Sequence, residues 1–402
     1  MPTRRDVLKH TMGAVALGTS GFSVAAYAAD QIQLPFGNGE RALVKYPQKR
    51  PLIQMTTRPP QLETPFSVFN EGVITPNDAF FVRYHLADIP LRIDPDTFQI
   101  AVKGKVTSPL NLSLKDLKTS FEPVEIVAVN QCSGNSRGFF EPRVAGGQLA
   151  NGAMGNAKWR GVSLKAVLDK AGIMPGAKQV TFNGLDGPVV PETPDFVKAL
   201  DIDHARDGEV MLAYVMNGAD LPHLNGYPVR LVVPGYYGTY WVKHLNEITV
   251  IDEVYDGFWM KSAYRIPNNA CACTPPGQPP TATVPINRFD VRSFITNLLD
   301  GATVKAGADT PVKGIAFDGG YGITDVLLSS DGGKTWTEAQ LGEDLGKYSF
   351  REWQSVVRLA PGTHDLRVRA INRIGQSQQT EPLWNPAGYM RNIVETTRVR
   401  AA

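Results

Sequence analysis

VEIVAVNQCSGNSR, residues 124–137, is the stretch from which the fold of this chain can best be argued. Its first half, Val124–Val129, is rich in β-branched residues, which predicts a strand. Cys132 follows that strand in a loop of small and polar residues, with Arg137 five residues further on. A thiolate held there is a soft ligand for a transition metal, and a nearby arginine favours the ionised form. The alternative is a small buried hydrophobic residue, and the loop alone favours neither.

Further strands and short helices are predicted around this stretch. Residues 98–102, 211–216 and 229–233 have strand composition, and an Asn-Gly turn follows the second of them. Residues 113–119 and 163–171 are each opened by a serine at the N-cap position, which predicts two helices. The mixture lacks a regular strand–helix alternation, so the predicted class is α+β.

The first 28 residues are predicted to be a signal peptide. Arg4-Arg5 precedes a weakly apolar stretch, and Ala26-Tyr27-Ala28 offers the small residues of a cleavage site. The paired arginines favour the twin-arginine route over an ordinary secretory signal. That route exports folded proteins, which predicts a cofactor inserted before export and a periplasmic location. Residues 29–65 are rich in Pro, Gln and Arg and are predicted to form an extended arm.

The rest of the chain divides at a proline-rich segment. Residues 66–273 form the predicted catalytic domain, and residues 274–285 hold five prolines, which is linker composition. Beyond it, 286–402 has short strands and regular turns, such as the Asp331-Gly332-Gly333 turn after Val326–Ser329. This pattern predicts an immunoglobulin-like β-sandwich.

Composition excludes several classes of protein. The chain has 402 residues and a net charge of +2, whereas a general nucleic-acid surface needs a clear basic excess. Three cysteines exclude a disulfide-stapled scaffold, and no apolar run is long enough to predict a spanning helix. Cys271 and Cys273 are one residue apart, a spacing that would make a strained disulfide ring. The pair is therefore expected to be incidental, with a metal or redox role less favoured.

Two other segments carry side chains suited to an anion. In Phe80–His85, strand alternation would place Arg83 and His85 on one face, where burying them is costly unless an anion meets them. A surface salt-bridge pair is the alternative. In 221–243, Arg230 opens an apolar strand and Lys243 follows a loop crowded with glycines and aromatic residues. That arrangement suits a planar, phosphate-bearing ligand.

Six segments in order resemble the sulfite oxidase family of molybdenum enzymes over about residues 65–395. They are FFVRYH, VNQCSGNSR, EVMLAYVMNGADLP, NGYPVRLVVPGYYG, WVKHL and SSDGGKTW. The closest similarity is to the molybdenum subunit of bacterial periplasmic sulfite dehydrogenases. The resemblance implies a sulfite-oxidase-type molybdopterin-binding domain followed by an immunoglobulin-like domain of the dimerisation type. It also implies one molybdenum-molybdopterin per chain, with Cys132 as the protein ligand of the metal.

The resemblance assigns further site residues. It places Arg83, His85, Arg137 and Tyr264 in the substrate site facing the metal. The residues that would hold the cofactor are Phe81, Val82, Arg83, Tyr84, His85, Asp186, Asn225, Arg230, Trp241, Val242 and Lys243. Two positions depart from the family: Asn225 stands where many members have a histidine, and Ala387 where eukaryotic members have an arginine. His223, two residues before Asn225, could substitute for that histidine.

The expected activity is oxidation of sulfite to sulfate, with electrons passed to a c-type cytochrome, either a dedicated subunit or a soluble carrier. The sequence shows no Cys-x-x-Cys-His, iron–sulfur cysteine set or G-x-G-x-x-G, so no haem, iron–sulfur cluster or flavin is expected in this chain. A homodimer through the C-terminal domain is a further expectation. The alternatives are a periplasmic molybdenum reductase of sulfoxides or N-oxides and, less favoured, an exported binding protein with a structural Cys132.

Overall fold

The computed structural model describes residues 31–402, so the predicted signal peptide lies outside the described residues. The first five strands form one antiparallel meander, in chain order. They are β1 (Gln31–Gln33), β2 (Glu40–Val44), β3 (Leu52–Thr56), β4 (Gln61–Glu63) and β5 (Val82–Arg83). Residues 31–65 thus make most of a sheet instead of a single extended arm. Leu52 and Leu62 are buried against Val82, which gives this polar segment its own apolar cluster.

One mixed sheet and one antiparallel sheet build the catalytic domain. The first has the order β11 (Lys198–Asp201), β10 (Gln179–Gly184), β15 (Leu245–Ile251), β6 (Gln99–Gly104) and β7 (Leu110–Ser113), with β15 and β6 parallel. The second has the order β13 (Ala219–Asp220), β12 (Met211–Met216), β9 (Met154–Ser163) and β8 (Pro123–Gln131), and β14 (Arg230–Val232) pairs with β12. The strands predicted at 98–102, 124–129, 211–216 and 229–233 are all present. The Cys132 loop follows the end of β8.

The helices are few and short. They are α1 (Leu114–Thr119), α2 (Leu164–Ala171), α3 (Ile202–Ala205) and α4 (Phe258–Lys261), with single 3-10 turns η1 (Phe66–Asn70), η2 (Arg137–Phe139), η3 (His223–Asn225) and η4 (Gly238–Tyr240). Both serines predicted as N-caps occupy that position. Ser113 forms a reciprocal capping box with Asp116, whereas the Ser163 side chain makes no capping hydrogen bond.

The proline-rich segment ends in a strand. β16 (Arg265–Pro267) pairs with β17 (Thr283–Pro285), and the intervening loop carries a disulfide between Cys271 and Cys273. The two cysteines, expected to be incidental because their spacing makes a strained ring, are therefore bonded to each other. Asn269 holds the loop closed, because its side chain accepts from the Cys273 N–H at 3.2 Å and donates to the Cys273 carbonyl at 2.8 Å.

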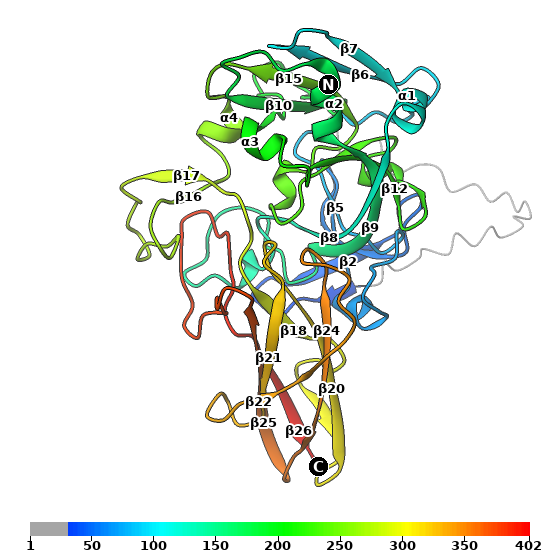
Figure 1. Ribbon diagram of the computed structural model, residues 1–402. Coiled ribbons are helices and arrows are strands. Elements are labelled where there is room, and N and C mark those ends of the chain that lie inside the picture. Colours follow the sequence, from blue (N-terminus) through cyan, green and yellow to red (C-terminus); the bar gives the residue numbers. More distant parts are fainter. Residues whose placement is uncertain (1–30) are drawn as a thin grey trace, which may run out of the picture.

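The C-terminal domain is the predicted two-sheet sandwich. One sheet has the order β18 (Arg292–Ile295), β20 (Asp309–Phe317), β24 (Arg351–Arg358) and β23 (Gln340–Leu341). The other has the order β19 (Ala302–Val304), β26 (Thr396–Ala401), β25 (Gly362–Asn372), β21 (Ile323–Ser329) and β22 (Thr337–Glu338). In Figure 1 this domain forms one end of an elongated molecule, and β6 and β7 lie at the other.

The main hydrophobic core crosses from the catalytic domain into the sandwich. The rings of η1 pack across the boundary, with Phe66 5.5 Å from Phe294 and Phe69 6.0 Å from Phe350 between centroids. Phe289 and Phe317 belong to the same buried cluster as the catalytic sheets. The two domains therefore share apolar packing in addition to the peptide that joins them.

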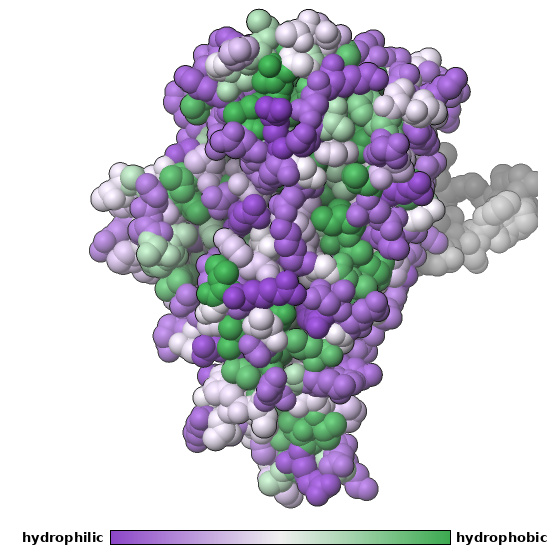
Figure 2. Space-filling model, viewed as in Figure 1, coloured by the Kyte–Doolittle hydropathy of each residue, from purple (hydrophilic) through white to green (hydrophobic). Residues whose placement is uncertain are grey.

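The exposed face in Figure 2 is mostly hydrophilic, with apolar residues in several separate areas. Within residues 31–402, no helix is both long enough and apolar enough to cross a membrane.

Candidate functional site

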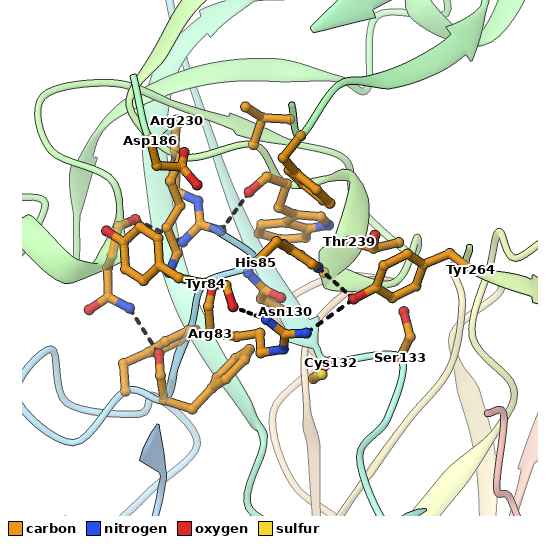
Figure 3. A pocket seen from close by; sticks show the side chains of 18 residues that line it. Arg83, Tyr84, His85, Asn130, Cys132, Ser133, Asp186, Arg230, Thr239 and Tyr264 are labelled. Carbon is orange, nitrogen blue, oxygen red and sulfur yellow. Dashed lines mark hydrogen bonds between the residues drawn. The ribbon is translucent and has the colours of Figure 1, made fainter. Parts of the chain in front are cut away.

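A pocket of about 580 Å³ opens where the N-terminal sheet, the loop after β8 and the segment following η3 meet (Figure 3). Its lining combines aromatic rings with cationic and amide side chains. The lining residues are Phe80, Phe81, Arg83, Tyr84, His85, Asn130, Cys132, Ser133, Asp186, Phe196, Asn225, Arg230, Gly238, Thr239, Trp241, Val242, Lys243 and Tyr264.

The Cys132 loop is fixed by hydrogen bonds on both sides of the thiol. The Cys132 N–H donates to the Ala153 carbonyl at 2.9 Å, and the Cys132 carbonyl accepts from the Asn135 N–H at 3.0 Å. The Asn135 side chain in turn accepts from the Ala153 N–H at 3.0 Å. Cys132 is the only free cysteine in residues 31–402, and Figure 3 shows its sulfur pointing toward Arg83 and Tyr264. The strand end therefore presents a fixed soft ligand to the pocket.

Three cations, Arg83, Arg230 and Lys243, line the pocket with one carboxylate, Asp186. Arg230 is 2% exposed and, among residues 31–402, donates only to main-chain carbonyls, at 2.9 and 3.1 Å. Burial lowers the pKa of Arg230 to about 9 and raises the pKa of Asp186 to about 6. Burying a cation without an opposite charge is costly. The pocket is therefore suited to an anionic ligand.

The side chains of Arg83, His85 and Tyr264 come together in the same pocket as the Cys132 sulfur. Tyr264 Oη lies 2.5 Å from His85 Nε2, and Arg83 Nη2 donates to the same oxygen across 3.4 Å. The His85 ring stacks on Phe196 with centroids 3.6 Å apart. Burial, and then the charge of Arg83, hold the pKa of His85 well below its usual value, while burial raises the pKa of Tyr264. Both side chains are therefore neutral near pH 7, and between them they can offer a proton to a bound oxygen.

Asn225 is held by a buried lysine. Lys49 Nζ donates to Asn225 Oδ1 at 2.5 Å and to the Phe80 carbonyl at 3.0 Å, and Asn225 Nδ2 donates to the Phe81 carbonyl at 3.0 Å. Burial lowers the pKa of Lys49 to about 7. His223 does not line the pocket, because its Nε2 lies 2.6 Å from the Pro90 carbonyl. Asn225 thus occupies the family's histidine position without help from His223.

The polar lining fits a large, phosphate-bearing cofactor. Asn130 Oδ1, Ser133 Oγ and Arg230 Nε are buried and have no hydrogen-bond partner within residues 31–402. A Cβ at Gly238 would lie 2.4 Å from Asn130 Oδ1, so the backbone of η4 approaches that amide closely. Buried polar atoms normally find a partner. A polar anion in the pocket would supply one, so these residues fit the molybdopterin that the resemblance implies.

The structure brings together all but two of the predicted site residues. Val82 turns away from the pocket and packs with Leu52 and Leu62. Arg137 is also absent from the lining, because its Nε donates to the Ala387 carbonyl at 3.0 Å and its guanidinium lies 5.0 Å from the centre of the Tyr389 ring. Side chains were expected to alternate between two faces along Phe80–His85. The strand β5 ends at Arg83, however, and Tyr84 and His85 both line the pocket.

Several lining residues were not predicted from the sequence. Asn130, Ser133, Gly238 and Thr239 lie inside the motifs that carried the resemblance, where proximity to Cys132 and Trp241 was the available signal. Phe196 lies far from every motif, and nothing in the sequence singled it out. The same holds for Lys198, which is fully buried with Nζ 5.4 Å from the centre of the Tyr264 ring.

Comparison with known families matches both halves of the chain. The Oxidoreductase molybdopterin binding domain matches residues 85–259, and the Mo-co oxidoreductase dimerisation domain matches residues 283–401. The mitochondrial sulfite oxidase of Macaca fascicularis is 34% identical over 376 residues, which are 89% of this chain and 67% of that protein. Sulfite oxidase of Arabidopsis thaliana is 30% identical over 391 residues, covering 89% of this chain and 96% of that protein.

A solved structure has the same fold. The sulfane dehydrogenase SoxCD from Paracoccus pantotrophus aligns with a TM-score of 0.74 over 98% of this chain and 96% of that chain, at 22% identity. The chain spans about two thirds of the length of its mammalian mitochondrial relatives, which are 33–34% identical to it.

Proposed function

The chain belongs to the sulfite oxidase family of molybdenum enzymes, and from this premise we propose that it oxidises sulfite to sulfate and passes the electrons to a c-type cytochrome. The observation that carries the proposal is the group of Cys132, Arg83, His85 and Tyr264, which line one part of the pocket together. It combines a soft metal ligand with a fixed cation and neutral hydrogen-bond donors. A small anion with several oxygens is the class of substrate that such a group of side chains can bind.

The cofactor would be held by two cations of the pocket together with neutral side chains beside them. Arg230 and Lys243 would bind its phosphate. Asn225 and Trp241 would contact its ring system, and Cys132 would bind its metal. The bound molybdenum centre supplies the two-electron redox chemistry. Arg230, Asn225 and Trp241 are buried, and both Arg230 and Lys243 donate to main-chain carbonyls, so this part of the pocket is held in place for a cofactor.

The protein's own contribution is to bind and orient sulfite. Arg83 offers forked donors that match the paired oxygens of the anion. Tyr264 and His85 are neutral, and each carries one proton. The hydrogen bond between them uses one of these two protons, so the other is available for a substrate oxygen. These groups offset the negative charge of the anion and turn its sulfur toward the Cys132 side of the pocket, which is the positioning that the reaction needs.

The electron acceptor, the compartment and the assembly are further parts of the proposal. Oxidation of sulfite releases two electrons, and a c-type cytochrome takes them one at a time. The paired arginines at residues 4 and 5 support folded export to the periplasm. The match to a dimerisation domain supports a homodimer, and a cytochrome subunit is the other assembly that we expect.

The test is a sulfite-dependent assay of cytochrome c reduction on purified protein whose molybdenum content has been measured. Near-stoichiometric molybdenum with rapid reduction of the cytochrome is expected. Cys132→Ser should keep the fold but lose turnover, because a hydroxyl is a poorer, harder ligand for this metal. Turnover of Cys132→Ser within a few-fold of the unmodified protein would refute the ligand assignment. Reduction of a sulfoxide or N-oxide without sulfite oxidation would refute the proposed reaction.

A further inference from the structure

Tyr264 needs support from outside its own segment. Its backbone has φ = 57°, in the left-handed region that a residue with a bulky side chain adopts only under constraint. The ring is 8% exposed, and its hydroxyl lies at the meeting point of His85 and Arg83. An unfavourable backbone conformation persists when surrounding packing enforces it. The packing on the Tyr264 ring is therefore part of the site.

The C-terminal half of the chain supplies that packing. The Tyr389 ring lies parallel to the Tyr264 ring, with centroids 5.6 Å apart and planes 6° apart. The Arg137 guanidinium lies 5.0 Å from the centre of the Tyr389 ring. The three side chains thus pack in series, Arg137 on Tyr389 and Tyr389 on Tyr264, and the series ends beside the pocket.

Tyr389 is presented by a firmly built turn. Asn385 is 3% exposed, accepts from the Tyr389 N–H at 3.1 Å and donates to the Tyr389 carbonyl at 2.8 Å. At Gly388, φ is 62°, and a Cβ there would lie 2.4 Å from Val144 Cγ2 and 2.8 Å from Arg137 Cγ. The turn therefore sits directly on Arg137 and leaves no room for a larger residue at Gly388. This construction fixes where the Tyr389 ring can lie.

We propose that Tyr389 is a positioning residue that holds the Tyr264 hydroxyl against His85 and Arg83. Its role in turnover rests on the proposed function, in which Tyr264 donates to the substrate anion. The contact is through the flat ring, because no hydrogen bond joins the two tyrosines and their planes are nearly parallel. Parallel aromatic pairs stabilise each other by contact area and by the charge distribution of the rings. The C-terminal part of the chain thereby supports Tyr264, a lining residue of the pocket, from behind.

The test compares Tyr389→Phe, Tyr389→Leu and Tyr389→Ala with Met390→Ala, a neighbouring partly buried residue of the same turn that does not line the pocket. Tyr389→Phe keeps the flat ring and should keep kcat/KM for sulfite within about two-fold. Tyr389→Leu and Tyr389→Ala remove the ring and should lower kcat/KM by about 10-fold or more, since displacing a reacting group by about 1 Å can cost up to 100-fold. The loss should appear in kcat and in sulfite affinity, with molybdenum content unchanged.

Crystal structures of the variants separate this proposal from the proposed function. In Tyr389→Ala or Tyr389→Leu, the Tyr264 hydroxyl should lose its hydrogen bond to His85 Nε2, whatever the enzyme oxidises. Tyr264 in its original place in both variants would overturn the positioning role, even if sulfite turnover were confirmed. A displaced Tyr264 in a protein that does not oxidise sulfite would retain the role and refute only the reaction. A drop of similar size in Met390→Ala would show a general effect of the turn and would also overturn the proposal.

Discussion

Arg83 combines two tasks at one position. It ends β5 at the edge of the N-terminal sheet, and its guanidinium reaches Tyr264 inside the pocket. Its main-chain carbonyl meanwhile accepts from Lys243 Nζ at 2.8 Å. The residue therefore connects the expected cofactor side of the pocket with the expected substrate side.

Replacing Arg83 tests the substrate side. Arg83→Gln removes the charge but keeps the main-chain carbonyl that binds Lys243, so molybdenum content should be retained. Loss of one preorganised cationic donor costs on the order of 2–4 kcal/mol of transition-state stabilisation, so kcat/KM for sulfite should fall by about two orders of magnitude or more. The control is Arg92→Gln, at an exposed arginine in the segment that connects β5 to β6. Equal kcat/KM in the two variants would contradict the role of Arg83 in anion binding.

Lys49 makes the stability of the cofactor-free protein depend on pH. Burial lowers its pKa from 10.5 to about 7. Between these values the unfolded chain holds a proton that the folded protein lacks, so the free energy of unfolding rises with pH, by up to about 1.4 kcal/mol per pH unit. Urea unfolding of cofactor-free protein at several pH values in this range should show the rise. Lys49→Met should reduce the slope without abolishing it, because burial also lowers the pKa of Lys198 to about 7, and the exposed Lys115→Met should leave the slope unchanged. A slope that Lys49→Met leaves unchanged would show that Lys49 stays charged when buried.

Elements were predictable where their signal was local. β8 and β12 are continuous runs of strand-forming residues, and the sequence also indicated both serine N-caps. The meander of residues 31–65 was missed because its strands are only three to five residues long, and they depend on pairing with each other and with β5. Lys198 and Phe196 were missed for a related reason, since only the folding of β11 against the pocket brings them to Tyr264 and His85. The contact of Arg137 with Tyr389 likewise joins segments that no sequence pattern relates.

The two serine caps differ in a way that mutation can measure. The Ser113 hydroxyl accepts from the Asp116 N–H at 3.1 Å, and the Asp116 carboxylate accepts from the Ser113 N–H at 2.9 Å. Ser113→Ala removes half of this capping box and should lower the free energy of unfolding by about 1 kcal/mol. Ser163→Ala at α2 removes no capping hydrogen bond and should cost clearly less. Denaturant unfolding provides both values, and a larger loss in Ser163→Ala would contradict the capping assignment.

On the scale of the whole molecule, the domains are joined at the catalytic loop as well as through the core. Arg292 is 2% exposed and donates to Ser136 Oγ at 3.0 Å and to Glu395 at 3.2 Å. Ser136 directly precedes Arg137, and its φ of 70° places it in the left-handed region. The sandwich therefore braces the loop that carries Cys132, in addition to supplying Tyr389.

Because Phe66, Phe69, Phe294 and Phe350 form a core shared by the two domains, we expect the domains to stay together when the peptide between them is cut. Gly277 lies in the exposed part of the proline-rich segment, with no atom within 4 Å of the place where its Cβ would be. A specific protease site introduced between Gly277 and Gln278 should therefore yield two fragments that remain associated during gel filtration. They should separate only in denaturant, retain sulfite turnover while paired and melt in one transition. Fragments that dissociate on cutting would show that the peptide, and not the apolar contact, holds the halves in place. Paired fragments would allow the catalytic domain and the sandwich to be exchanged between related enzymes as separately made halves.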